Sequence, residues 1–395
     1  MEIANRLQGI GEYYFSQKLR EIEQLNQEAA PSIINLGIGS PDLPPHPDVI
    51  NCLHQTSLKS DHHAYQSYKG SLILRHAVAK WYFDHYNVDI NPNTEILPLI
   101  GSKEGIMHIC MTYLNPGDEV LIPNPGYPTY SAAVKLAGGT VREYRLEESG
   151  KWMPDLENLK GTGAKLMFVN YPHMPSGQSP SRHFFEKVIR FAKEENILII
   201  HDNPYSFILN DDPLSLLSVE GAMDVALELN SLSKSHNMAG WRVGALLGSA
   251  FHIENVLRFK SNMDSGMFLP VQLAAATALS LDKSWYAAQN SIYSRRRKIA
   301  YRIMDALDCI IAKDQTGMFL WGRIPEKYAD SYQYSDEILR SARVFLTPGG
   351  IFGSQGNQYL RLSLCTSESG LQKSLDRILQ YKSQQSAATT QTAGS

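Results

Sequence analysis

The chain has 395 residues, more than one ordinary hydrophobic core accommodates, so at least two folded units are expected. Apolar residues make up 43% of it, as in globular proteins, and the formal net charge at pH 7 is only −3. So weak a charge gives no electrostatic reason to expect binding to nucleic acid or to an anionic membrane surface.

The N-terminal residues, MEIANRLQGIGEYYF, lack the apolar core of a signal peptide, and no stretch reaches the roughly 18 uninterrupted apolar residues of a membrane span. We therefore expect a cytoplasmic protein. The four cysteines are scattered, with no CxxC pair and no histidines at metal-ligand spacing, so ordinary thiols are expected rather than a metal site. A connecting segment rich in Gly and Pro follows at residues 34–47, INLGIGSPDLPPHP.

The middle of the chain alternates short apolar runs with helix-like segments such as SPSRHFFEKVIRFAKEEN at 179–196. This alternation predicts βαβ units and an α/β fold with a mainly parallel sheet flanked by helices. Ligands of such sheets bind at the carboxyl ends of the strands, where polar residues gather in this sequence. The predicted strands are EILPLIGS (95–102), DEVLIPNPG (118–126), AKLMFVNYP (164–172), NILIIHDNPY (196–205), DVALELNSLS (224–233) and VGALLGS (243–249).

After about residue 285 the pattern changes to a long charged helix, SWYAAQNSIYSRRRKIAYRIMDAL, and isolated strands, GMFLWGRI and YLRLSL. This change predicts a second, smaller α+β unit. The final stretch, KSQQSAATTQTAGS, is small and polar without periodicity, so a disordered tail is expected. The predicted parts are an N-terminal arm with part of the small domain (1–45), a large ligand-binding domain (46–284), a small C-terminal domain (285–381) and the tail (382–395).

The strongest chemical signal is SLSKSHNMAGWRVG at residues 231–244. A predicted strand delivers Ser231, Ser233 and Lys234, and Arg242 follows between two glycines. Hydroxyls and a guanidinium suit a phosphate, while an amine can form an imine with a carbonyl, so the loop favours a phosphate-bearing carbonyl ligand. A solvated surface turn is the alternative for a Ser-rich loop with a lysine.

This lysine motif resembles that of the class I/II aminotransferases, which are fold-type I enzymes dependent on pyridoxal 5'-phosphate (PLP). The resemblance extends in order over roughly residues 35–365. It is carried by LGIGSPD, YQSYKG, GSKEGI, NPGYPTY, NYPHMPSG, DNPY, the lysine motif and YLRLSL. It implies a PLP-dependent aminotransferase that moves an amino group from an L-amino acid to a 2-oxo acid by a ping-pong route through pyridoxamine phosphate.

The resemblance also implies catalytic roles. Lys234 would hold PLP as an imine and then carry the proton between the donor Cα and the cofactor. Asp202 would pair with the protonated pyridine nitrogen, and Tyr205 would donate a hydrogen bond to the phenolic oxygen of the cofactor. Without the resemblance, Asp202 could cap a helix before Pro204, and Tyr205 could be a core tyrosine.

For the cofactor phosphate, the resemblance implies the backbone N–H groups of Ser102 and Lys103, where a glycine turn leads into a helix. Ser231, Ser233 and Arg242 would complete this phosphate site. Ser102 could equally be an N-cap without a ligand.

Tyr127, between Gly126 and Pro128, would lie on the face of the pyridine ring, unless it only packs in a Pro-rich loop. Tyr65 matches the tyrosine that reaches the phosphate of the neighbouring subunit, which would require a homodimer with a shared active site. Arg361 would grip the substrate α-carboxylate as a planar fork, with a structural salt bridge as the alternative. Backbone at Gly39 would approach the same carboxylate.

One motif departs from the family. Most relatives read Asn-Pro-Thr-Gly where this chain reads Met174-Pro175-Ser176-Gly177. The usual Asn donates a second hydrogen bond to the phenolic oxygen, and Met cannot do so. We expect Tyr205, alone or with help from His173 or Asn170, to serve that oxygen.

Two other functions stay open at this point. A β-eliminating C–S lyase of the same fold would use the same residues. A non-catalytic effector domain of a transcription regulator would need a DNA-binding domain ahead of the fold. The substrate loop begins by residue 36, so we expect no room for such a domain before it. SNMDSGMFLPVQLAA at 261–275 resembles the diaminopimelate-type and broad-range branch more than the aspartate-specific branch, but the sequence does not identify the substrate.

Overall fold

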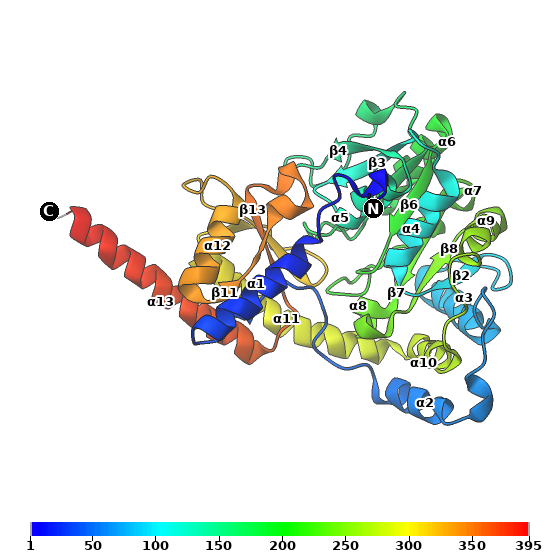
Figure 1. The fold of residues 1–395 in the computed structure, drawn as a ribbon, viewed down its shortest axis with the longest axis horizontal. Coiled ribbons are helices and arrows are strands. Elements are labelled where there is room, and N and C mark those ends of the chain that lie inside the picture. Colours follow the sequence, from blue (N-terminus) through cyan, green and yellow to red (C-terminus); the bar gives the residue numbers. More distant parts are fainter. Residues whose placement is uncertain (1, 394–395) are drawn as a thin grey trace.

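The computed structural model describes residues 2–393. Its centre is a seven-stranded sheet in the order β2-β8-β7-β6-β5-β3-β4, in which only β8 runs antiparallel to its neighbours (Figure 1). The predicted α/β fold with a mainly parallel sheet is confirmed. The strands are β2 (Ile96–Leu99), β3 (Glu119–Asn124), β4 (Thr140–Arg145), β5 (Leu166–Val169), β6 (Leu198–Asp202), β7 (Ala226–Ser231) and β8 (Gly244–Leu247).

Helices cover both faces of this sheet, because alternate side chains of each strand point to opposite faces. One apolar cluster joins the sheet to α4, α5 and α9, and the larger cluster joins the other face to α3, α6 and α10. The helices of this part are α2 (Pro47–Ser57), α3 (Leu72–Tyr86), α4 (Ser102–Tyr113), α5 (Pro128–Leu136), α6 (Arg182–Glu195), α7 (Ala222–Val225), α8 (Leu232–Ser235), α9 (Ala250–Lys260) and α10 (Leu269–Leu279).

A second, antiparallel sheet lies in the C-terminal part of the chain, in the order β12-β13-β10-β9. The long helix α11 leads to it from the first unit, and α1 lies beside this second unit although it comes from the N-terminus (Figure 1). Its elements are α1 (Tyr14–Glu28), α11 (Lys283–Ala306), β9 (Ile310–Ile311), β10 (Phe319–Arg323), α12 (Ser331–Ala342), β12 (Thr347–Pro348), β13 (Tyr359–Ser363) and α13 (Glu368–Ala393).

The segment before α2 is tied to this second unit. The short strand β1 (Ile34–Asn35) pairs in parallel with β11 (Val344–Phe345), and a small apolar cluster joins Ile22 of α1 to Leu339 of α12. Short 3-10 helices complete the chain: η1 (Asn5–Leu7), η2 (Ser60–His62), η3 (Glu157–Leu159), η4 (Leu216–Ser218), η5 (Ala239–Trp241), η6 (Gly349–Phe352) and η7 (Ser354–Gly356).

The C-terminal segment differs from its sequence prediction. Residues 382–395 were expected to form a disordered tail, whereas α13 continues without a break to Ala393, and residues 394–395 lie outside the described part of the chain. The stretch holds no Pro and only one Gly, and its Gln and Ala residues are good helix formers, so an established helix can propagate into it. Within the described residues, no helix is both long and apolar enough to cross a membrane.

Candidate active site

A cavity of about 350 Å³ opens at the carboxyl ends of the central strands, between the two sheets. This is the edge at which open α/β sheets bind their ligands. All but one of the residues predicted for the site line it: Gly39, Ser102, Lys103, Tyr127, Asn170, Asp202, Tyr205, Ser231, Ser233, Lys234, Arg242 and Arg361. The structure thus brings together residues that are more than 300 positions apart in the sequence.

Lys234 lies on the single turn of α8, directly after β7, and its Nζ donates a hydrogen bond to the backbone carbonyl of Gly39. Burial lowers the pKa of this amine; Cys365 opposes the shift, and the charges of Arg361 and Arg242 add to it. A lower pKa makes the neutral amine, which is the form that acts as nucleophile and base, easier to populate near neutrality.

Asp202 ends β6 and is 5% exposed. Its Oδ2 accepts a hydrogen bond of 2.8 Å from the Tyr130 hydroxyl, whereas its Oδ1 is buried without a partner. Burial raises the pKa of Asp202 to about 6, against the lowering effects of Tyr130 and His201. An unpartnered carboxylate oxygen in a cavity is costly, so it fits a ligand that brings an N–H donor.

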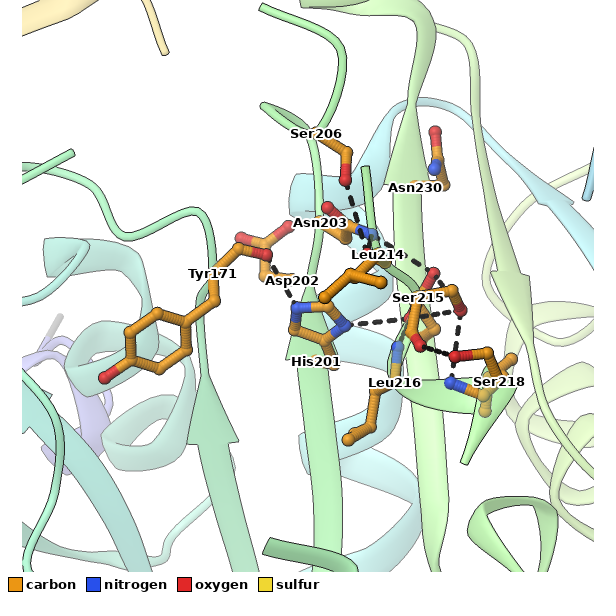
Figure 2. A network of polar contacts seen from close by, with 12 residues as sticks. Tyr171, His201, Asp202, Asn203, Ser206, Leu214, Ser215, Leu216, Ser218 and Asn230 are labelled. Carbon is orange, nitrogen blue, oxygen red and sulfur yellow. Dashed lines mark hydrogen bonds and ion pairs between the residues drawn. The ribbon is translucent and has the colours of Figure 1, made fainter. Parts of the chain in front are cut away.

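A buried polar network fixes β6 behind Asp202 (Figure 2). His201 Nδ1 lies 2.8 Å from Glu228 Oε2, which accepts, and its Nε2 lies 2.9 Å from the Tyr171 carbonyl. Glu228 also accepts hydrogen bonds from Tyr82 and Ser215. Because side chains alternate along a strand, this network holds the side of β6 opposite to Asp202.

One end of the cavity has groups that suit an anion. Helix α4 begins at Ser102 with Gly101 as its N-cap, which provides no side-chain cap, so the N–H groups of its first turn are available to a ligand. Gly101 has φ +81°, and a Cβ there would lie 2.1 Å from Arg242 Nη2. Arg242 Nη1 lies 3.4 Å from Ser233 Oγ. Backbone donors, hydroxyls and one guanidinium therefore converge, as a phosphate requires.

The loop at 170–177 uses its polar groups to hold itself together. Asn170 donates to the Asp202 carbonyl at 2.7 Å and accepts from the Met174 N–H at 2.9 Å. Both ring nitrogens of His173 are engaged, one with Ser176 Oγ at 2.7 Å and the other with the Pro125 carbonyl at 3.1 Å. Burial lowers the pKa of His173 to about 4. The expectation that His173 assists Tyr205 therefore finds no support in the structure.

Arg361 projects from β13 and is 4% exposed. Its Nη2 donates to the Gly37 carbonyl at 2.7 Å, its Nη1 lies 3.2 Å from Met174 Sδ, and its Nε is buried without a partner. Burial lowers the pKa of Arg361 to about 10, which leaves the guanidinium charged at neutral pH. The structure provides no salt bridge for this arginine among the described residues, so its charge is available to an anionic ligand.

Tyr65 is the predicted site residue that does not line the cavity, since its side chain is 93% exposed in this single chain. Sequence reasoning missed further residues that do line it. Tyr130 stood inside the quoted NPGYPTY motif, and only its hydrogen bond to Asp202 reveals a role. The other missed residues are aromatic or apolar and gave no signal of a ligand: Tyr13, Phe15, Ile38, Pro204, Ala239, Phe319 and Phe352.

Residues 31–378 match the family model for aminotransferase class I and II. The LL-diaminopimelate aminotransferase of Oleidesulfovibrio alaskensis is 38% identical over 95% of this chain and 98% of its own, and that of Dehalococcoides mccartyi strain BAV1 is 37% identical over 97% and 99%. The substrate-bound structure of BacF from Bacillus subtilis has a TM-score of 0.92 and 35% identity, and the match covers 97% of this chain and 98% of that one.

These relatives span nearly the whole chain, and the resemblance drawn from the sequence motifs is confirmed. Enzymes of this family use PLP to move an amino group from an amino acid to a 2-oxo acid. The chain belongs to the class I and II aminotransferase family and is a PLP-dependent aminotransferase.

Proposed function

We propose that Lys234, Asp202 and Tyr205 carry the transamination reaction in this cavity. Lys234 would bind the cofactor covalently through its amine and afterwards accept and return the proton of the donor Cα. When bound, PLP supplies the electron sink for the charge that develops at that carbon. Tyr205 would donate a hydrogen bond from its hydroxyl to the phenolic oxygen of the cofactor, since burial raises its pKa and keeps it protonated.

The observation that best supports this proposal is the unpartnered Oδ1 of buried Asp202 in the same cavity as Lys234. A protonated ring nitrogen would give that oxygen its missing donor and would keep the carboxylate ionised. The anion-binding end formed by α4, Ser231, Ser233 and Arg242 fits the cofactor phosphate. Tyr127, which caps α5, would stack on the ring, and Asn170 would hold the loop beside it.

We propose that the donor α-carboxylate binds Arg361, with backbone near Gly39 beside it. The free Nε and the charge of Arg361 support this role. A Cβ at position 39 would meet the Phe319 ring at 2.3 Å, so glycine is needed there for close packing.

The experiment that tests the function is a screen of L-amino acid donors against 2-oxoglutarate and pyruvate with the PLP-loaded enzyme. For a transaminase, repeated turnover of the donor amino acid should require a 2-oxo acid. Without a 2-oxo acid, each enzyme should convert at most one donor, because the cofactor itself then accepts the amino group. Release of pyruvate and ammonia without an acceptor would instead indicate the C–S lyase activity, which no observation here favours. No conversion with any donor would contradict the assignment and return attention to a non-catalytic effector role.

We propose a homodimer in which Tyr65 reaches the phosphate of the partner's cofactor, since its exposed side chain has no role in its own cavity. Residues 46–284 would form the cofactor-binding domain, and residues 1–45 and 285–381 would form the smaller domain. Because the curated relatives are named LL-diaminopimelate aminotransferases, LL-diaminopimelate is one candidate donor. We also propose that the enzyme acts in amino-acid metabolism in the cytoplasm, and cell fractionation would test this location.

A further inference from the structure

A second group of titratable side chains lies where α4 meets the end of α9, and none of its members lines the cavity. Glu104 and His108 are four residues apart on α4, so they share one face of that helix. Asp264 follows the end of α9 at Lys260. One ligand atom from each of Glu104, His108 and Asp264 lies within 4.8 Å of the other two. The fold thus gathers an imidazole and two carboxylates in one place.

The His108 ring is fully buried, and neither of its nitrogens has a hydrogen-bond partner among the described residues. A neutral imidazole carries one N–H donor and one lone pair, so burying both without partners costs free energy. Its Nε2 lies 3.5 Å from Glu104 Oε1, which is longer than an ordinary hydrogen bond. The ring therefore faces the glutamate without being satisfied by it.

Asp264 is satisfied on one side only. Its Oδ1 accepts a hydrogen bond of 2.6 Å from the ammonium of Lys260, whose side chain is 1% exposed. Its Oδ2 is buried without a partner among the described residues. With a neutral imidazole, two carboxylates and one ammonium leave one net negative charge on the cluster. Lys260 therefore neutralises only half of the carboxylate charge.

The spacing of these groups fits a metal ion. Ligands at about 2.1 Å from a tetrahedral zinc ion lie about 3.4 Å from one another. The 3.5 Å between His108 Nε2 and Glu104 Oε1 is close to this value. The side chains of Glu104 and Asp264 are 20% and 13% exposed, so rotation of these carboxylates can bring the third ligand atom to the same spacing.

We propose that Glu104, His108 and Asp264 bind a divalent transition-metal ion, and zinc in preference to magnesium or calcium. An imidazole with two carboxylates suits Zn²⁺, whereas Mg²⁺ and Ca²⁺ prefer oxygen ligands alone. The metal would take the lone pair of His108 Nε2 and would give Asp264 Oδ2 its missing partner. Lys260 would keep its hydrogen bond to Oδ1 and so orient that carboxylate.

The bound ion would join α4 to the segment that follows α9. Glu104 also accepts a hydrogen bond of 2.8 Å from the Ile100 N–H, so the same carboxylate holds the turn that leads into α4. The segment after α9 packs closely on residues 66–67, since a Cβ at Gly266 would lie 2.4 Å from the Ser67 carbonyl oxygen. The metal is therefore expected to stabilise this part of the fold and to take no part in the reaction.

Calorimetric titration of chelator-treated, PLP-loaded enzyme with Zn²⁺ tests the site and needs no turnover. We expect one ion per chain with a dissociation constant below about 10 μM, and no competition from millimolar Mg²⁺. Zinc should also raise the melting temperature, and EDTA should reverse the rise, because only the folded chain assembles the ligands. The absence of any zinc binding tighter than about 10 μM would overturn the inference.

Variants show whether zinc binds at this cluster. His108→Gln should weaken zinc binding at least about 100-fold, and Asp264→Asn, which keeps an acceptor for Lys260, at least about tenfold. The second variant decides the matter if the first does not fold. His183→Gln is the matched control, since it removes an exposed histidine that lies 3.7 Å from Glu186 of its own helix. It should bind zinc as the wild type does.

Anomalous diffraction at the zinc edge from zinc-soaked crystals locates the ion directly. The proposal predicts a peak about 2.1 Å from His108 Nε2. Zinc found only at surface histidines, or bound equally tightly by Asp264→Asn and the wild type, would show adventitious binding and would overturn the inference.

Discussion

At the scale of one residue, the buried carboxyl of Asp202 lowers the stability of the cofactor-free protein. Its carboxyl is buried with one oxygen unpartnered, and its pKa rises to about 6 from an ordinary value of 3.8. An unfolded chain ionises the group at the lower value, so at neutral pH ionisation favours unfolding of the cofactor-free protein. Cofactor binding would relieve this penalty by supplying a donor.

The Asp202→Asn variant should therefore gain stability and lose activity. Without cofactor at pH 7, its free energy of unfolding should exceed that of the wild type by about 3 kcal/mol, because each pKa unit is worth about 1.4 kcal/mol. The gain should shrink as the pH falls through 6 and vanish below about 4. With cofactor, kcat/KM should fall roughly 10²–10³-fold.

Urea unfolding at several pH values and single-turnover kinetics measure both effects. Asp212→Asn, at an exposed position, is the matched control and should change neither quantity. A cofactor-free Asp202→Asn protein that is less stable than the wild type at pH 7 would contradict this account of the carboxyl.

Met174 stands where the resemblance to the family implies an asparagine beside the cofactor. It contributes a sulfur to Arg361 and no hydrogen-bond donor to a phenolic oxygen. In the Met174→Asn variant, the pH at which the visible absorbance of the lysine-bound cofactor titrates should fall, because an added donor stabilises the phenolate and weakens its hold on the imine proton. Spectrophotometric titration of both enzymes checks this, and an equal or higher pKa in the variant would refute it.

At the scale of elements, six strands of the central sheet were predictable because each is a short apolar run that ends in polar or turn residues. Strand β4 (TVREYR) was missed, since it lies at the edge of the sheet and alternates exposed charged residues with few apolar ones. The aromatic residues of the cavity were missed for a related reason. Phe15 and Phe319 look like core residues in the sequence, and only the meeting of α1 and β10 places their rings beside Arg361.

The network between β6 and β7 gives a second pH-dependent contribution to stability. Burial raises the pKa of Glu228, but His201, Tyr82 and Ser215 outweigh burial, so the net pKa is lowered. Glu228 therefore stabilises the fold above the ordinary pKa of a glutamate, and this contribution is lost as the pH falls through the lowered value.

Glu228→Gln should lower the free energy of unfolding at pH 7 by about 3 kcal/mol, because a buried charged acceptor is replaced and His201 loses its carboxylate. The deficit should narrow at acid pH. Chemical denaturation across pH 4 to 8 measures it, with Glu220→Gln at an exposed position as the control. A variant whose stability matches the wild type at pH 7 would show that the network does not stabilise β6.

At the scale of the whole molecule, Tyr65 is exposed and does not line the cavity that contains the predicted lysine, aspartate and arginines. The proposed homodimer gives this side chain a phosphate to bind. Tyr65→Phe should then weaken cofactor affinity about tenfold, as the loss of one charge-assisted hydrogen bond predicts. Tyr68→Phe, also an exposed tyrosine of the same segment, is the control. Equilibrium dialysis measures the affinity, and unchanged cofactor binding in Tyr65→Phe would contradict the shared site.

The central claim, that Lys234 is the residue that holds the cofactor, is open to one direct measurement. The PLP-loaded enzyme is reduced with borohydride, digested and analysed by mass spectrometry. The account predicts a phosphopyridoxyl group on the peptide that contains Lys234 and none in Lys234→Ala. A label on Lys103 or on any other lysine, with Lys234 unmodified, would contradict it.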